Sequence, residues 1–280
     1  LPSIWPGVRA GDVAAVQDML VEGAFIDEDN NEGRTPLMIA CASGDTPMVR
    51  LLVEETHPPA NLAARAAESW TPLMIACGAG ALEVVKVLVN AGAGLGDSDT
   101  TFGSTPLMWA CGGGHHNVVR YMLDTCPTSG LLQARNKEGC CPLMITCDGG
   151  DLKTVQVLVD AGADLKAFNL EGLTALDLAT RSGSRAVEHF LKKRGATRSR
   201  DFWEAIETGD TPTVEDFLHS NSHLVRAVDK AGRTALLLAC LGGHSSLVET
   251  LVRTGAEVDF QDTCGTCPLN VAVLLGNISL

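Results

Sequence analysis

Apolar residues recur along this chain at the three- and four-residue spacing that marks one face of a helix. The stripe formed by Val84, Val85, Val87 and Leu88 is typical, because these residues fall on one side of a helical wheel. Each such stripe follows a shorter apolar run that ends at a glycine, as Gly80 ends the run before this stripe. The pattern therefore predicts pairs of short helices joined by glycine turns.

The helix pairs belong to an internal repeat. The segment Thr35-Pro36-Leu37-Met38-Ile39-Ala40-Cys41 returns in closely similar form at Thr71, Thr105 and Cys141, and weaker copies start at Thr174, Thr234 and Cys267. A glycine stands nine positions after each start, from Gly44 to Gly276, and the same spacing back from Gly11 and Gly209 adds starts at Pro2 and Arg200. The spacings are 33, 36, 34, 36, 33, 26, 34 and 33 residues, so the repeat covers the whole chain.

Each unit carries the local signals of two antiparallel helices. A threonine at the start can cap the first helix with its hydroxyl, and the following proline occupies the first turn, where no backbone donor is needed. Asp or Asn with a later glycine, as in Asp229 and Gly232, closes a tight turn ahead of the next start. Glycine-alanine pairs end the second helix in a left-handed turn: Gly92-Ala93, Gly162-Ala163, Gly195-Ala196 and Gly255-Ala256.

These repeated residues resemble the ankyrin repeat family over the whole chain. The resemblance implies an all-α fold, an ankyrin-repeat solenoid of stacked helix-turn-helix units with β-turn fingers. The starts predict about eight full units plus a truncated ninth. Four units depart from the family by carrying Met38, Met74, Met108 and Met144 where histidine is usual, and we expect these methionines to fill the core.

The 26-residue spacing marks an irregularity at the seventh unit. Between Ala196 and the start at Arg200 there is no room for a finger, and the unit that follows echoes the opening unit through Trp203 and Gly209. We therefore divide the chain into a first array of six units, 1–198, and a second block, 199–280, of two units and a truncated one. Because an open array end exposes apolar surface, we also expect the natural protein to continue beyond Leu280.

Composition narrows the classes of function. Hydrophobic residues make up 45% of the chain and aromatic residues only 4%, which suits thin helical layers packed from aliphatic side chains. The net charge of 21 − 34 = −13 argues against a nucleic-acid partner, since phosphate binding needs a positive field. No run of eighteen or more uncharged apolar residues occurs, so we expect no membrane partner.

Ten cysteines would allow a metal or disulfide framework, but the repeat explains most of them. Five share one small, inward-facing position of the first helix, and we expect them to be buried, reduced and free of metal: Cys41, Cys77, Cys111, Cys147 and Cys240. Repeated reduced thiols indicate the cytoplasm or the nucleus. Cys264 and Cys267 have redox or zinc spacing, yet no second pair lies nearby, so a metal or redox protein is a remote alternative. We expect no cofactor.

No catalytic constellation occurs in the sequence. No histidine lies in a Ser-His-Asp or His-Glu-x-x-His pattern, and there is no phosphate-binding loop of Walker type. His115, His116 and His244 follow helix-ending glycines, where the family often has a histidine bonded to backbone. The chain is therefore predicted not to be an enzyme, and we expect no small-molecule ligand.

One segment reverses the acidic charge. Residues 181–200 hold seven of the 21 basic side chains and one acidic residue, Glu188. Lys192, Lys193 and Arg194 would complement the negative end of a helix that stops before Gly195, which is a purely structural explanation. A nuclear-import signal or a surface for an acidic partner is the alternative.

The resemblance also indicates where a partner would lie. Ankyrin proteins usually bind partners on the concave side, against finger tips and the exposed face of the first helices. The matching positions here are Arg34, Trp70, Ile75, Gly78, Phe102, Ser104, Trp109, Gly112, Gly113, Glu138 and Ile145. Large rings flank a nearly bare floor, which favours close approach of an extended backbone, although drift at solvent-facing positions would also leave glycines there. Trp109 could instead pack on the neighbouring finger and serve only stability.

The resemblance thus implies a non-catalytic protein-protein interaction module, a scaffold or adaptor that binds a short extended segment of another protein on its concave face. The alternative is the substrate-recognition or regulatory arm of a larger enzyme or channel, such as a ubiquitin ligase or a kinase. The fold alone does not separate the two, because the same fold serves many functions.

Overall fold

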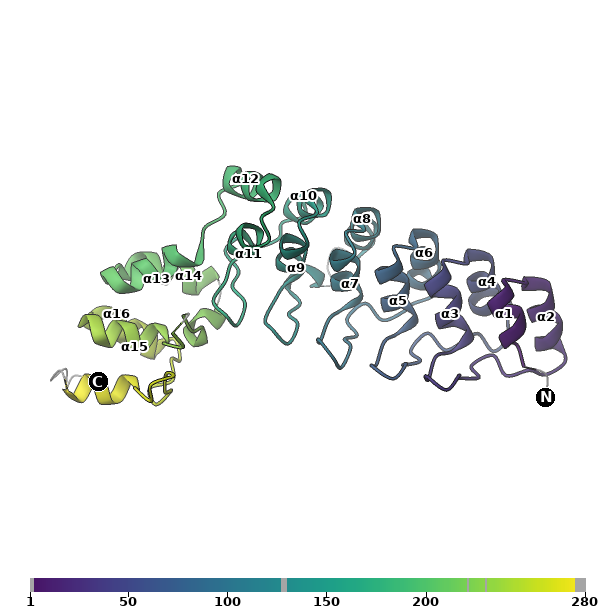
Figure 1. Cartoon of the computed structure of the whole chain (residues 1–280), viewed down its shortest axis with the longest axis horizontal. Helices are drawn as coiled ribbons and strands as arrows, with labels where there is room; N and C mark the ends of the chain where they lie inside the picture. Colours follow the sequence, from purple (N-terminus) through teal and green to yellow (C-terminus); the bar gives the residue numbers. More distant parts are fainter. Residues whose placement is uncertain (1–2, 127–129, 221, 230, 275–280) are drawn as a thin grey trace. The chain divides into compact units, whose positions relative to one another are not determined.

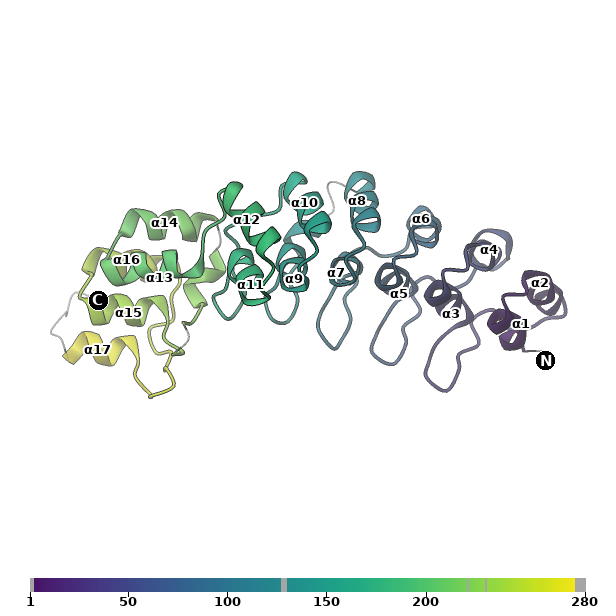
Figure 2. The same ribbon diagram turned by 45° about the horizontal axis from the view of Figure 1, so that its top comes forward.

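A computed structural model describes residues 3–126, 130–220, 222–229 and 231–274. Paired helices follow one another along the chain, and in the first compact unit the loops ahead of α3 (Pro36–Ser43), α5 (Pro72–Ala79) and α7 (Pro106–Gly112) project from the same side of these helices (Figure 1, Figure 2). The predicted start at Pro2 and the predicted glycine at Gly276 lie outside the described residues.

The helices have the following bounds. The first helices of the pairs are α1 (Trp5–Ala10), α3 (Pro36–Ser43), α5 (Pro72–Ala79), α7 (Pro106–Gly112), α9 (Pro142–Gly149), α11 (Ala175–Arg181), α13 (Ser199–Thr208) and α15 (Ala235–Gly242). The second helices are α2 (Val13–Val21), α4 (Thr46–Arg50) continued by η1 (Leu51–Glu55), α6 (Leu82–Asn90), α8 (His116–Thr125), α10 (Leu152–Asp160), α12 (Arg185–Lys193), α14 (Thr211–Ser220) and α16 (Ser245–Arg253). Two short helical turns, η2 (Leu131–Gln133) and η3 (Ser222–Arg226), and a further first helix, α17 (Pro268–Leu274), complete the elements.

The residues form two compact units by their internal contacts. The first unit comprises Leu1–Lys137 and Lys153–Ala163, and the second comprises Glu138–Leu152 and Asp164–Leu280. The division of the repeats into 1–198 and 199–280 stays a prediction.

The first helices begin and end where the repeat pattern predicts. In α3 the Thr35 hydroxyl accepts a hydrogen bond from the Met38 backbone N–H (3.4 Å), and Thr71 and Thr105 cap α5 and α7 in the same way. Gly44, the C-cap of α3, has a φ of 70° in the left-handed region that glycine adopts without strain. α9 differs, because Cys141 stands at its N-cap and makes no side-chain capping bond.

Aliphatic and sulfur-containing side chains fill the layers. The methionines at the family's histidine position, Met38, Met74, Met108 and Met144, are each at most 1% exposed, which confirms that they are core residues. The five cysteines of the shared position are buried, as predicted. Burial raises the pKa of the Cys41 and Cys77 thiols well above the usual range and keeps both thiols protonated at neutral pH.

The finger predicted to be missing at the seventh unit is missing. α12 ends at Lys193 and α13 begins at Ser199, so only residues 194–198 separate these helices. The finger before α11 lies against later segments instead: a Cβ built on Gly172 would be 3.0 Å from the Val228 carbonyl oxygen and 3.2 Å from the Trp203 ring. Because Gly172 also has a φ of +71°, both conformation and space exclude a side chain there.

An aromatic cluster ties the same finger to the core of the following helices. Phe168 meets Phe202 and Phe217 edge to face, with ring centroids 5.5 and 6.0 Å apart. Phe168 is thereby part of the buried cluster that is otherwise built from residues of α13 to α17. The rings contribute large buried area to a chain that has few of them.

Candidate protein-binding groove

A groove crosses the first unit over the exposed faces of α3, α5 and α7, which lie side by side (Figure 1). Its volume is about 570 Å³. The lining consists of residues from three successive units: Arg34, Ala42, Trp70, Met74, Ile75, Gly78, Ala79, Trp109, Gly112 and Gly113. Most of these side chains are apolar or absent, so the groove presents rings and backbone to solvent.

Two tryptophans form the aromatic wall of this groove. The Trp70 and Trp109 rings meet edge to face, with centroids 4.9 Å apart and an interplanar angle of 66°. Phe102, in the finger ahead of α7, approaches Trp109 in a similar way at 6.3 Å. Both tryptophans are half-buried, whereas Phe102 is 49% exposed. Edge-to-face ring pairs prefer this geometry, so the contacts fix the orientation of the rings in addition to burying apolar area.

Asp99 holds Trp109 in place from the neighbouring finger. Its buried carboxylate accepts hydrogen bonds from the backbone N–H groups of Phe102 (2.6 Å) and Ser104 (3.0 Å) and from the Trp109 indole Nε1 (3.2 Å). The indole of Trp70 has no such anchor, since its nitrogen is buried and has no hydrogen-bond partner among the described residues. The two rings of the wall are therefore held by different forces.

The role of Asp99 was not predicted from the sequence, although a signal for it exists. Other fingers have, one position nearer to the start of the next unit, a residue whose side-chain oxygen accepts hydrogen bonds from finger N–H groups: Asn30, Asn169, Asp229 and Asp262. Alignment of the fingers would have revealed the turn. It would not have revealed the bond to Trp109, which depends on how the finger meets the helix.

The floor of the groove is low because backbone forms it. A Cβ built on Gly78 would lie 3.7 Å from the Trp109 ring, which is an ordinary contact, so an alanine would fit there. Glycine inside a helix costs about 0.5–1 kcal/mol relative to alanine. The packing around Gly78 therefore does not explain why the position is glycine.

Hydrogen bonds between units hold the groove in shape. His115 Nε2 lies 2.9 Å from the Gly78 carbonyl oxygen, which agrees with the backbone-bonding role predicted for the histidine after a helix-ending glycine. At the rim, the Thr100 N–H donates to the Glu68 carbonyl (3.2 Å), and the Lys137 N–H donates to the Phe102 carbonyl (2.8 Å). A rim joined in this way is already ordered, which lowers the entropy cost of binding.

The structure places the predicted site residues in three groups. Those that line one groove are Arg34, Trp70, Ile75, Gly78, Trp109, Gly112 and Gly113. Phe102 adjoins this groove through Trp109, whereas Ser104 is 8% exposed and does not line it. Glu138, which is exposed, and Ile145, half-buried on α9, belong to the second unit, and their part in binding stays a prediction.

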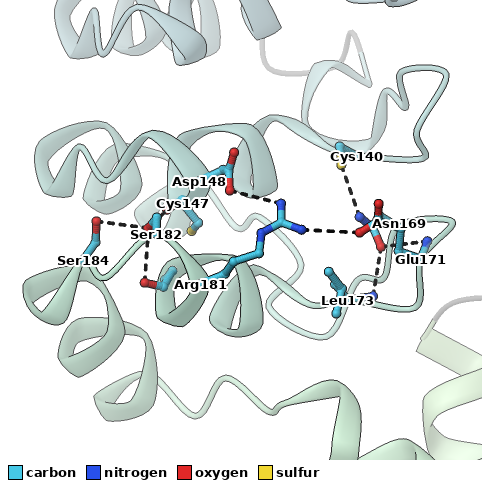
Figure 3. A network of polar contacts seen from close by, with 10 residues as sticks. Cys140, Cys147, Asp148, Asn169, Glu171, Leu173, Arg181, Ser182 and Ser184 are labelled. Atoms are coloured by element: carbon cyan, nitrogen blue, oxygen red, sulfur yellow. Dashed lines mark hydrogen bonds and ion pairs between the residues drawn. The ribbon is translucent and has the colours of Figure 1, made fainter. Parts of the chain in front are cut away.

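Two first helices of the second unit, α9 and α11, carry charges on their exposed face (Figure 3). Arg181, at the end of α11, forms ion pairs with Asp148 of α9 (3.2 Å) and with Glu171 of the intervening finger (3.4 Å). Beside these pairs, the Ser182 hydroxyl donates to the Cys147 carbonyl (3.2 Å). The exposed face of α9 and α11 is thus bridged by side chains rather than left open.

Other kinds of site find little support in the described part of the chain. No three or more side chains of His, Cys, Asp and Glu come together there as they would around a metal ion. No described helix is both long enough and apolar enough to cross a lipid bilayer.

Comparison with known proteins establishes the family. A family model for ankyrin repeats, built on three copies, matches residues 7–99, 92–169, 128–200 and 202–280. This chain belongs to the ankyrin repeat family. Ankyrin repeats are generally protein-protein interaction modules and are generally not catalytic. This array is therefore a module of a kind that generally binds other proteins.

Curated relatives resemble only part of the array. The ankyrin repeat and SAM domain-containing protein 6 of Danio rerio is 29% identical over 119 residues, which cover 40% of this chain and 16% of that protein. The B-cell lymphoma 3 protein homolog of Mus musculus is 30% identical over 132 residues, or 42% of this chain and 29% of that protein. The ankyrin array thus spans less than a third of either relative.

Proposed function

We propose that the first unit of this ankyrin array binds a short, extended segment of another protein along the groove between Trp70 and Trp109, and that the chain acts as a scaffold or adaptor. The open floor beside the aromatic wall carries the proposal. Gly78 keeps that floor low at a cost in helix stability, although its neighbours leave room for alanine. The buried cysteines at the repeated position support a reducing compartment, the cytoplasm or the nucleus.

The dimensions of the groove match a peptide of modest length. Packed helices lie about 8–10 Å apart, so a path over α3, α5 and α7 covers roughly 16–20 Å. An extended chain advances about 3.3 Å per residue, so about six residues would fill this path. Their backbone would pass over Gly78 and Gly112, and one or two apolar side chains would pack on the tryptophan rings.

Arg34 would orient the segment at the α3 end of the groove. Its side chain is 39% exposed, and its Nε lies 3.5 Å from a carboxylate oxygen of Glu32, a pair too exposed to hold Arg34 firmly. A carboxylate on the bound segment could therefore displace Glu32 and form a charge-assisted contact with Arg34.

The test uses Ala79 rather than Trp109, because Trp109 also stabilises the finger through Asp99. Ala79 is exposed, lies on α5 and lines the groove, so Ala79→Gln would fill the groove without touching the core. Ala14→Gln is the matched control, since Ala14 is an exposed alanine on α2, outside the groove. Peptides selected from a random display library on the purified chain supply the ligand, and titration calorimetry measures each variant.

We expect Ala79→Gln to weaken the selected peptides at least tenfold, or about 1.4 kcal/mol, and Ala14→Gln to leave them unchanged. Hydrogen exchange on the complex should show protection in α5 and α7. Binding that tolerates Ala79→Gln, or protection confined to other helices, would place the partner elsewhere and overturn the proposal.

A further inference from the structure

The helix α12 differs in charge from every other second helix of the described pairs. Each of the others carries at most one Lys or Arg, whereas α12 carries Arg185, Lys192 and Lys193, and Arg194 follows at its C-cap. The protein as a whole has a net charge of −13, so a basic face is not what solubility requires here. The excess of cations belongs to this one helix.

Interactions within α12 explain only part of this excess of cations. Lys193 at the end of the helix complements the helix dipole, as predicted from the sequence, but Arg185 is the first residue of α12, where a cation opposes that dipole. Lys192 replaces an apolar residue, since the same repeat position holds Val89, Leu123, Val159 and Val252 in other units. Residues that break a local preference without a local gain are expected at functional surfaces.

The cations share one exposed face. Val187 and Leu191 face the core, and on a helix Arg185, His189, Lys192 and Lys193 point away from them, which agrees with the exposure of all four. Glu188, at the edge of this face, pairs with Lys192 (2.6 Å) and Arg198 (2.9 Å), and these bonds lower the pKa of Glu188. Among the described residues, Arg185 and Lys193 form no ion pair.

We propose that this face of α12 binds an extended, Asp- and Glu-rich segment of a protein partner. Arg185 and Lys193, which form no ion pair among the described residues, stand about 12 Å apart along the helix. An extended peptide advances about 3.3 Å per residue, so side chains four residues apart point to one side at intervals of about 13 Å. Carboxylates at every fourth position of a peptide would therefore match the spacing of these two cations.

Charge and shape favour this occupant over other anions. An anionic membrane or a nucleic acid would face the acidic remainder of the protein as well as α12, whereas a short peptide contacts α12 alone, within about one Debye length. A phosphate group is usually held by backbone N–H groups at a helix N-terminus. The stripe instead offers separated side-chain cations along the helix, which suits several spaced carboxylates.

The test measures a fluorescein-labelled peptide with Glu at alternate positions, Ser-Glu-Ser-Glu-Ser-Glu-Ser-Glu, by anisotropy on the full chain. We expect binding at low salt that weakens as salt rises, and a Kd at least tenfold higher for the double variant Arg185→Glu, Lys193→Glu. The matched control is Arg253→Glu, because Arg253 occupies in α16 the position that Lys193 occupies in α12. Arg253→Glu should change the Kd less than twofold, and so should Ala79→Gln, which separates this surface from the groove.

A second variant guards against misfolding. Arg185→Gln with Lys193→Gln removes the charges without placing acids on the helix, and circular dichroism checks that it folds; it should still weaken binding at least threefold. An equal loss in Arg253→Glu would reduce the effect to general charge and overturn the proposal. Tighter binding of a phosphopeptide, phosphatidylserine vesicles or single-stranded DNA than of the glutamate peptide would overturn it as well.

Discussion

Seven residues after the start of the repeat, α3, α5 and α7 of the first unit have Ala42, Gly78 and Gly112, whereas α9 and α11 of the second have Asp148 and Arg181. In the first unit this position forms the floor of an open groove beside two tryptophans. In the second unit it carries an arginine that bridges two acids (Figure 3). The first helix of the repeat thus presents an open surface in one unit and a charged surface in the other. Both are possible because this position faces outward and is not constrained by the core.

The ion pairs of Arg181 in the second unit cover the exposed face of α9 and α11 but contribute little to the stability of the fold. The side chains of Arg181 and Asp148 are both 55% exposed, and exposed ion pairs contribute about 0–1 kcal/mol. A peptide that crossed α9 and α11 would have to displace these pairs, whereas in the groove of the first unit only the exposed pair of Arg34 with Glu32, at one end, would be displaced. The predictions below test this difference.

Alkaline pH should give the largest effect, and the first unit should be the more sensitive. The folded state keeps Cys41 and Cys77 protonated while unfolded thiols ionise above the usual pKa of 9.0. The contribution of these two thiols to the unfolding free energy is therefore fully present below pH 9. Above pH 9 it falls by about 1.4 kcal/mol for each thiol and each pH unit. In the second unit, burial raises the pKa of Cys140 to about 11, so its contribution levels off there. Urea titrations between pH 8 and about 10.5 measure the slope.

The control for this prediction replaces both deep thiols. Cys41→Ala with Cys77→Ala should flatten the pH dependence of the unfolding free energy while lowering its value at pH 7. A slope that survives the double replacement would show that other groups cause the alkaline loss.

The two tryptophans of the groove should differ in their contribution to stability. Trp109→Phe removes the indole bond to Asp99 and should lower the unfolding free energy by about 1–2 kcal/mol. Trp70→Phe removes a buried N–H that has no partner among the described residues, so its effect should stay within about 0.5 kcal/mol. Urea denaturation of both variants tests the contrast, and equal losses would contradict the assigned hydrogen bonding.

Placing an acidic and a basic side chain on the floor of the groove should give the first unit a charged surface like that of α9 and α11. Gly78→Asp with Gly112→Arg should weaken a groove-binding peptide at least tenfold, about 1.4 kcal/mol, with little change in stability. The matched control, Asp148→Gly with Arg181→Gly, should leave the affinity unchanged. Calorimetry on both variants decides, and equal weakening by the two would mean that the peptide also uses the second unit.

The missing cap of α9 should be repairable. Cys141→Thr restores the hydroxyl that caps the equivalent helices and should raise the unfolding free energy by about 1 kcal/mol. Thr71→Cys makes the reverse change in the first unit and should lower it by a similar amount. Thermal unfolding followed by circular dichroism measures both, and shifts of the same sign would refute the capping argument.

Removing the bridge of the second unit should have the smallest effect. Arg181→Ala should lower the unfolding free energy by no more than about 0.5 kcal/mol, since both of its ion pairs are exposed. Repeating the urea titration in high salt should abolish even this loss, because salt screens exposed charges. A loss that persists in salt would show that the side chain stabilises by packing.

The groove shows how far residue patterns reach toward a binding surface. Trp70, Gly78 and Trp109 could be assigned to one concave face from their repeat positions, and they do line one groove. The same rule assigns Ser104 to this face, but Ser104 is buried. Its exposure is determined by the packing of its finger, which the repeat position does not reveal. Repeat position predicts direction, whereas exposure depends on the neighbouring unit.

The sequence by itself determined the helix ends and the inward positions. Thr35 caps α3 and Gly44 ends it through bonds that span four residues or fewer, so the local sequence suffices. The deep burial of Cys77 follows from a position that recurs in every layer. Such features depend on spacing along the chain, which a repeat makes visible.

Only the tertiary structure decided what the outward positions became. The bond from Trp109 to Asp99 joins residues on different elements, and the reach of Arg181 to Asp148 spans two repeats. Neither has a pattern in sequence, because the first depends on how the finger folds back on α7 and the second on the angle at which α11 meets α9. That angle results from the packing of the whole core, and it is also what leaves Gly78 open on one surface and places Arg181 over another.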